Sequence, residues 1–152
     1  MTSLDSFLDQ VDRLTRRLIR NVEYCDRALV TCCDLTAAQA YALLTLQETG
    51  EITMNELASE MRLHSTTMTR MIDNLIEKGL VERRQDPDDR RVVRVGLSQP
   101  GDSTALRLKR TKREFLETAF SGLSDIERSA LLSALQRLES IAEALGEGCC
   151  AS

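Results

Sequence analysis

Apolar residues recur with helical spacing in the middle of the chain, between Ser65 and Gly79. They follow the i, i+3, i+4, i+7, i+8 pattern of a helix with one buried face: Met68, Met71, Ile72, Leu75 and Ile76. Ser65 can cap the start of this helix, and Gly79 can take the C′ position at its end. The pattern therefore predicts a helix between these two residues with one face in a core.

The opposite face of this predicted helix carries short hydrogen-bonding groups and one guanidinium. Its residues are Ser65, Thr66, Thr67, Thr69, Arg70, Asp73 and Asn74. Such groups can read base edges when a helix enters the major groove of DNA. The competing interpretation is a solvated helix surface, which is the ordinary one for a helix considered alone.

The sequence after Gly79 predicts a β-hairpin. Leu80 to Arg84 has the alternating, β-branched character of a strand, Gln85 to Asp89 is rich in turn residues, and Arg90 to Leu97 is a return strand with three valines. Arginines on a hairpin beside a reading helix can contact phosphates or the minor groove. The candidates are Arg84, Arg90 and Arg91. An ordinary solvated hairpin charge is the alternative for each.

Two residues near these candidates receive other roles. Asp89 is expected to orient Arg91, because a carboxylate repels phosphate. His64 is the only histidine, and its place before the predicted helix favours a cap or a phosphate contact over metal binding.

Three stretches between Ile52 and Ser98 match one known arrangement. Residues 52–58 are similar to the first helix of a helix-turn-helix, residues 75–81 to the exit from a recognition helix, and residues 89–98 to a wing. Together they resemble the MarR family of winged helix-turn-helix transcription regulators, whose wing has an Asp-x-Arg run and ends in Leu-Thr. Ser98 replaces the usual Thr here, and Gly96 replaces a longer residue, which is expected to loosen the wing.

Amphipathic helices are predicted on both sides of this segment. Apolar stripes run through residues 4–31, through a helix that Thr36 caps and Gly50 ends, and through a charged helix after Pro100-Gly101. A last helix starts at Ser124, with Glu127 completing a capping box, and is expected to end at Gly146-Glu147-Gly148.

The fold class expected is mainly α with a small β wing. The chain, residues 1–152, is interpreted as a single domain with a winged helix-turn-helix at 36–98 and dimerisation helices at 1–34 and 100–148. The first and the last two helices carry more apolar surface than one small domain can cover, so a homodimer is expected. The resemblance implies the same assembly on a pseudo-palindromic site in double-stranded DNA.

The charge of the chain is unevenly distributed. The net charge is −4, but residues 62–94 contain eight Lys and Arg against six Asp and Glu, so the predicted reading segment is basic. No run of 18 apolar residues and no leader pattern is present in the sequence. A cytoplasmic protein with no membrane partner is therefore expected.

Five cysteines cluster at two places in the sequence: Cys25, Cys32, Cys33, Cys149 and Cys150. In a reducing compartment they are expected to be free thiols, metal ligands or redox groups. Cys25 and Cys32 lie about 10.5 Å apart along a helix, too far to share one metal, so the C-terminal pair would have to help. A soft metal or metalloid ion or an oxidant is one candidate inducer.

The function expected is a sequence-specific DNA-binding regulator, a repressor that an inducer releases. The thiols form one candidate sensor, and the alternative is a small aromatic or phenolic ligand with incidental cysteines. No cofactor is required in either case. No catalytic pair or triad can be assembled around the single histidine, so an enzyme is not expected.

Overall fold

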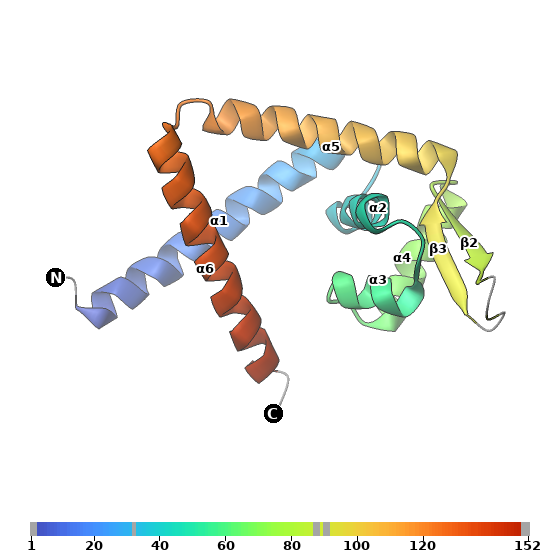
Figure 1. The fold of residues 1–152 in the computed structure, drawn as a ribbon, viewed down its shortest axis with the longest axis horizontal. Helices are drawn as coiled ribbons and strands as arrows, with labels where there is room; N and C mark the ends of the chain where they lie inside the picture. Colours follow the sequence, from blue (N-terminus) through green and yellow to red (C-terminus); the bar gives the residue numbers. More distant parts are fainter. Residues whose placement is uncertain (1–2, 32, 87–88, 90–91, 150–152) are drawn as a thin grey trace. The chain divides into compact units, whose positions relative to one another are not determined.

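The computed structural model describes residues 3–31, 33–86, 89 and 92–149. Within them lie six helices and three strands (Figure 1). In chain order these are α1 (Leu4–Thr31), α2 (Ala37–Thr49), β1 (Ile52–Thr53), α3 (Met54–Glu60), α4 (Ser65–Glu77), β2 (Val81–Gln85), β3 (Val93–Leu97), α5 (Gln99–Phe120) and α6 (Asp125–Cys149). The expected class, mainly α with a small β wing, is confirmed.

The chain divides into two compact units, Met1–Arg113 and Glu114–Ser152. The core of the first unit forms where α2, α3, α4, β2 and β3 meet (Figure 1). Its fully buried large side chains are Leu43, Leu46, Leu57, Met68, Ile72, Leu75, Val81 and Val95. Three of these belong to the apolar face that the spacing predicted for α4, so that face is confirmed.

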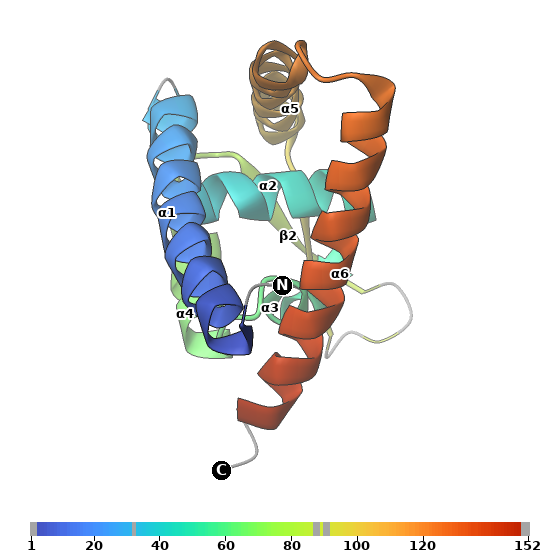
Figure 2. The same ribbon diagram turned by 90° about the vertical axis from the view of Figure 1, so that its left-hand side faces the viewer.

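Among the described side chains of α1, the one buried in this core lies at the C-terminal end of the helix. Val30 is buried there, whereas large apolar residues of the preceding turns are exposed. Figure 2 shows α2 crossing beside the end of α1 that precedes it in the chain. The bounds of α1 agree with the predicted helix over residues 4–31.

The sheet has three antiparallel strands in the order β1-β3-β2. Sequence reasoning had assigned Ile52 and Thr53 to the first helix of the motif, and this was wrong: Ile52 pairs with Val95, and Thr53 pairs with Arg94. The side chain of Thr53 caps α3, where Glu56 completes a capping box, so the helix begins at Met54. A two-residue strand exists only through its partner, which explains why no local pattern announced it.

The helix ends show which predicted caps are correct. Thr36 caps α2, and Ser124 with Glu127 forms the capping box of α6, both as expected. Ser65 is not the cap of α4. His64 occupies that position, but its side chain makes no capping hydrogen bond. Lys78 is the C-cap of α4, so Gly79, with φ of 70°, stands at C′ as predicted.

The wing joins α5 through a tight junction at Ser98. Its hydroxyl donates to the Gly79 carbonyl at 2.6 Å and accepts from the Gly101 amide at 3.1 Å. Ser98 therefore caps α5, which begins at Gln99 and includes Pro100-Gly101 in its first turn instead of following them. The small hydroxyl satisfies two backbone groups at once, of which the Gly101 amide is buried.

The second unit contains the end of α5 and all of α6. The predicted end of α6 at Gly146-Glu147-Gly148 was wrong, because the helix continues to Cys149. Each glycine costs about 1 kcal/mol in a helix interior but still supplies its backbone hydrogen bonds, so glycine alone does not stop a helix. No helix within the described part of the chain is long and apolar enough to span a membrane.

Candidate nucleic-acid interface

Helices α3 and α4 are joined by a turn that contains a strained residue. Arg62 has φ of 50°, a left-handed conformation that few non-glycine residues adopt. The turn is closed by the Leu63 amide, which donates to the Ala58 carbonyl at 2.9 Å. The turn separates α3 from α4, and one side of α4 lies outside the core.

The exposed side of α4 presents the first predicted reading residues. Ser65, Thr66, Thr67 and Arg70 are exposed, opposite the buried Met68 face. Within the described residues, no hydrogen bond or ion pair engages the Arg70 guanidinium. Its five donors are therefore available to an acceptor outside the chain, and a bidentate contact to guanine is the typical one in a major groove.

Two predicted reading residues are engaged inside the protein. The Thr69 hydroxyl donates to the Ser65 carbonyl one turn earlier at 2.8 Å. The Asn74 side-chain oxygen accepts from the Gln39 amide of α2 at 2.7 Å. Both residues remain on the exposed side of α4, but their available hydrogen-bonding capacity is smaller than the sequence suggested.

The wing is organised by a carboxylate that sequence reasoning passed over. Asp86 is buried, forms an ion pair with Arg94, and accepts a hydrogen bond from the Asp89 amide at 3.1 Å. These contacts tie the end of β2 to β3 and to the hairpin tip. The only local signal was a turn-type Asp, and its partner Arg94 lies on the other strand.

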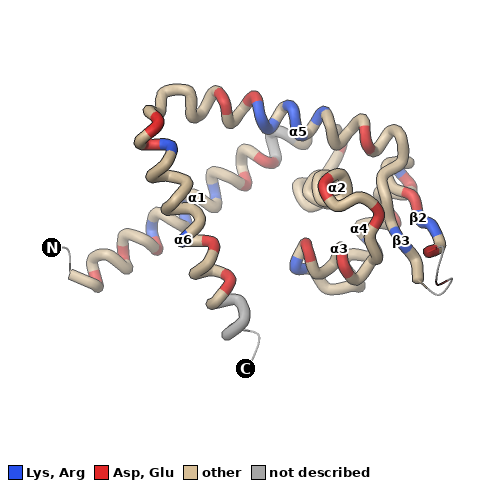
Figure 3. The backbone as a smooth tube through the Cα atoms, viewed as in Figure 1, with Lys and Arg blue, Asp and Glu red and all other residues tan. Residues whose placement is uncertain are grey.

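Arg84 lies on β2 between two carboxylates. It forms ion pairs with Glu51 and, at 3.1 Å, with Glu82. The hydrogen bond to Glu82 and the charges of Glu51 and Glu82 raise the pKa of Arg84. Figure 3 shows this mixture of basic and acidic residues on β2 and β3. A DNA contact by Arg84 would have to compete with these partners.

Two of the predicted wing residues, Arg90 and Arg91, lie outside the described residues. The expectation that Asp89 orients Arg91 therefore stays a prediction. The expected loosening of the wing by Gly96 also stays a prediction. Gly96 is buried beneath the Glu51 side chain, which a Cβ would meet at 2.6 Å.

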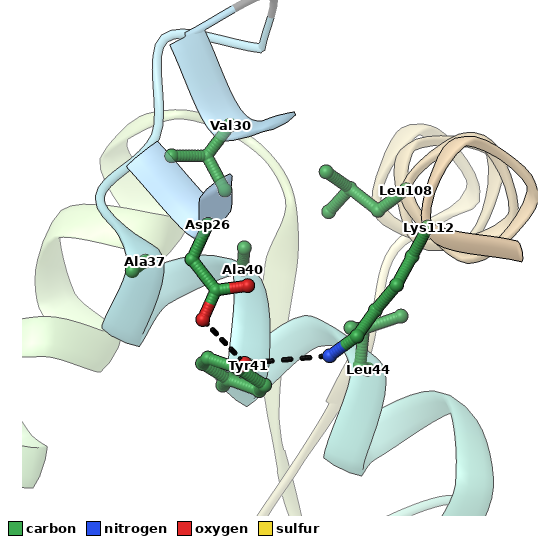
Figure 4. A pocket seen from close by; sticks show the side chains of 8 residues that line it. All are labelled: Asp26, Val30, Ala37, Ala40, Tyr41, Leu44, Leu108 and Lys112. Carbon is green, nitrogen blue, oxygen red and sulfur yellow. Dashed lines mark hydrogen bonds between the residues drawn. The ribbon is translucent and has the colours of Figure 1, made fainter. Parts of the chain in front are cut away.

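A small pocket lies between α1, α2 and the first part of α5, all within the first unit (Figure 4). Its volume is about 20 Å³, enough for about one water molecule. The Tyr41 hydroxyl donates to Asp26 at 2.6 Å and accepts from Lys112 at 3.3 Å. The Lys112 ammonium also lies 4.7 Å from the centre of the Tyr41 ring.

The phenol of Tyr41 is held in its neutral form. Burial, the hydrogen bond to Asp26 and the negative charge of Asp26 together raise the pKa of Tyr41 to about 12. Sequence reasoning missed this group, because Asp26, Tyr41 and Lys112 lie far apart in the chain. The remaining lining of the pocket is apolar: Val30, Ala37, Ala40, Leu44 and Leu108.

The structure describes only part of the predicted thiol site. Cys25 and Cys33 are both half-buried, and the Cys33 sulfur accepts a hydrogen bond from Arg107 at 3.2 Å. Cys32 and Cys150 lie outside the described residues, as does the side chain of Cys149. Among the described residues no group of three His, Cys, Asp or Glu could hold a metal ion.

Known proteins with similar sequences and folds share this arrangement. The model of the MarR family matches residues 35–93. The chain is 30% identical over 129 residues to the uncharacterized HTH-type transcriptional regulator YsmB of Bacillus subtilis, and the match covers 85% of this chain and 88% of that protein.

Two crystal structures have the same fold. Streptococcus pneumoniae FabT in complex with DNA superposes with a TM-score of 0.82 at 22% identity, over 91% of this chain and 99% of FabT. A mutant of E. coli MarR complexed with operator DNA superposes with a TM-score of 0.75 at 25% identity, over 90% of this chain and 99% of that one. The chain therefore belongs to the MarR family of DNA-binding, winged helix-turn-helix transcription regulators.

Proposed function

We propose that the protein is a homodimeric repressor that binds a pseudo-palindromic operator. Helix α4 would contact the bases, and the wing, the hairpin of β2 and β3, would contact the phosphates of the flanking DNA backbone. The observation that carries this proposal is the exposed guanidinium of Arg70 on α4, which has no hydrogen-bond or ion-pair partner among the described residues. Ser65, Thr66 and Thr67 precede it at the N-terminal end of the same helix. Short polar groups with one arginine at this end of a helix suit base readout. Arg84, Arg90 and Arg91 are the proposed backbone contacts.

The homodimer is supported by apolar surface that the single chain leaves exposed. On α1 the exposed large apolar residues are Leu4, Phe7, Leu8, Leu14, Leu18, Ile19 and Val22. On α6 they are Ile126, Leu131, Leu132, Leu135, Leu138 and Ile141. Stripes of this length are typical of helices that bury their faces against a second copy. Two copies would present two reading helices, as a palindrome requires.

An inducer would act by shifting populations. The protein would have one conformer that binds DNA and one that does not. The inducer releases DNA only to the extent that its affinity for the second conformer exceeds its affinity for the first. Coupling of about 1 to 3 kcal/mol, roughly 5- to 150-fold in DNA affinity, is usual between two such sites. We place this activity in the cytoplasm with the DNA and assign no catalytic role, because the relatives are transcription regulators.

The first candidate sensor is the set of thiols. Cys32 and Cys33 adjoin in sequence, as do Cys149 and Cys150, so each pair offers two soft donors to one thiophilic centre. Cys33 follows α1 and precedes the first turn of α2, so a ligand there would act directly on the start of the DNA-binding segment. Cys25 would be a secondary contributor.

The second candidate sensor is the Tyr41 pocket. Its apolar walls suit an aromatic ring, and Lys112 could pair with an acidic group on that ring. At about 20 Å³ the pocket cannot hold such a ligand unless a lining side chain moves. A phenolic acid would therefore select a conformer different from this one, as an inducer should.

One release assay discriminates between these sensors. Operator DNA is bound by the wild type, by Cys32→Ser with Cys33→Ser, and by Cys149→Ser with Cys150→Ser. Arsenite, cadmium, zinc, peroxide and 4-hydroxybenzoate are then titrated. Loss of the response to a thiophilic agent or oxidant in either variant supports the thiol sensor. If every agent releases both variants as it releases the wild type, the thiol sensor is excluded and the Tyr41 pocket remains as the candidate sensor. An absence of operator binding by the wild type would contradict the repressor itself.

A further inference from the structure

Gln39 is a buried polar residue whose side chain joins two helices. It lies in the first turn of α2 and is 9% exposed. Its oxygen accepts from the Thr36 amide at 3.0 Å, which is half of the capping box of α2. Its amide nitrogen donates to the Asn74 oxygen in α4 at 2.7 Å.

The capping box fixes the direction in which this side chain can donate. Because the oxygen of Gln39 faces the Thr36 amide, the nitrogen must face the other way, toward α4. Asn74 supplies the acceptor there. The cap of one helix therefore orients a contact to the next, and a buried donor would be left unsatisfied without Asn74.

A second link lies one turn further along α4. The Lys78 ammonium donates to the backbone carbonyl of Asp34, and it lies 3.1 Å from the Asp34 carboxylate. Asn74 and Lys78 are four residues apart, so both project from the same side of the helix. Their partners, Gln39 and Asp34, flank Thr36 at the corner between α1 and α2.

We propose that Asn74 is a positioning residue, which through Gln39 sets the orientation of α4 on DNA, and that it does not read a base itself. This proposal rests on the proposed operator binding. Arg70 lies one turn before Asn74, and a bidentate contact from Arg70 tolerates little rotation of the helix. The link to the α1–α2 corner restrains that rotation, so operator preference depends on a contact made inside the protein.

The test is a set of four proteins that differ only at these two positions. Asn74→Asp still accepts from Gln39, and Gln39→Glu still caps α2 and can accept from the rotated amide of Asn74. The double variant places two carboxylates together with no donor between them. The matched control is Ala38→Glu with Asn74→Asp, which has the same net charge and leaves Gln39 intact, because Ala38 is an exposed neighbour of Gln39.

The readout is the ratio of affinities for operator and scrambled DNA, with thermal unfolding measured in parallel. Each variant lowers the affinity ratio by some factor relative to the wild type. We expect the ratio of the double variant to lie about tenfold below the value that the product of the two single-variant factors gives. The control should match its own product. Three results would overturn the proposal. The first is a double variant whose affinity ratio equals the product of the single-variant effects. The second is a loss of preference at one base pair in Asn74→Asp alone. The third is a fall in thermal stability with an unchanged affinity ratio. If the wild type itself shows no preference, the repressor proposal fails instead.

Discussion

The backbone of Leu80 lies directly against Gly101. A Cβ built on Gly101 would stand 1.8 Å from the Leu80 carbonyl oxygen, well inside the contact distance of the two atoms. Leu80 connects α4 to β2, and Gly101 lies in the first turn of α5. Because Gly101 has no side chain, α5 can begin beside the backbone that follows α4.

Replacement of Gly101 by alanine should destabilise the protein. Neither atom of this clash is the end of a flexible side chain, so the backbone must move, at a cost of about 1 to 3 kcal/mol or more. Gly122→Ala is the control, because nothing lies within 4 Å of its Cβ position. Urea unfolding should separate the two variants. Equal stability of both would show that the junction can relax freely.

Arg70→Ala should weaken operator binding by about 1 to 3 kcal/mol and relax preference at one base position. Lys109→Ala removes the same charge from α5 and should leave the preference unchanged. Binding to a panel of operators with single base changes measures both effects. If Arg70→Ala weakens binding equally on every sequence, the guanidinium contacts a phosphate instead of a base.

The substitutions Arg90→Ala and Arg91→Ala should reduce the salt dependence of DNA binding. Each phosphate that an arginine neutralises contributes about 0.9 to the slope of log affinity against log salt concentration. Titrations at several salt concentrations, with operator and with scrambled DNA, give this slope directly. Slopes that match the wild type would remove the wing tip from the interface.

The phenol of Tyr41 should make stability depend on pH only in the alkaline range. The folded-state pKa of about 12 lies above the ordinary value of 10.0, so the unfolded chain loses this proton first. The stabilising contribution is fully present below about pH 10 and is lost as the pH rises toward 12. Between about pH 9 and about pH 11, the free energy of unfolding should fall less in Tyr41→Phe than in the wild type. Parallel curves would contradict the raised pKa.

Local periodicity was sufficient to predict most of the helices. Met68, Ile72 and Leu75 fall on one face by spacing alone, and that face is buried. Thr36, Ser124 and Gly79 act within a few residues of their own positions, so their roles could be predicted without knowledge of the fold.

The site needed information that no local pattern contains. The sequence pattern predicted Asn74 to read a base, and it could not show that the Asn74 side-chain oxygen accepts a hydrogen bond from Gln39, 35 positions away. Asp86 with Arg94, and Tyr41 with Asp26, are likewise pairs that only the tertiary fold brings together. Polar spacing on a helix identifies the exposed face, but it does not distinguish groups that remain available from groups that already have partners.

Selection of binding sites from random double-stranded DNA by the full chain tests the central claim most directly. The account predicts an enriched site with two-fold symmetry and half-sites about one helical turn apart. At physiological salt the enriched site should bind about 10³-fold or more tightly than a scrambled duplex. An absence of any enriched sequence, with equal affinity for the scrambled duplex, would contradict a sequence-specific regulator.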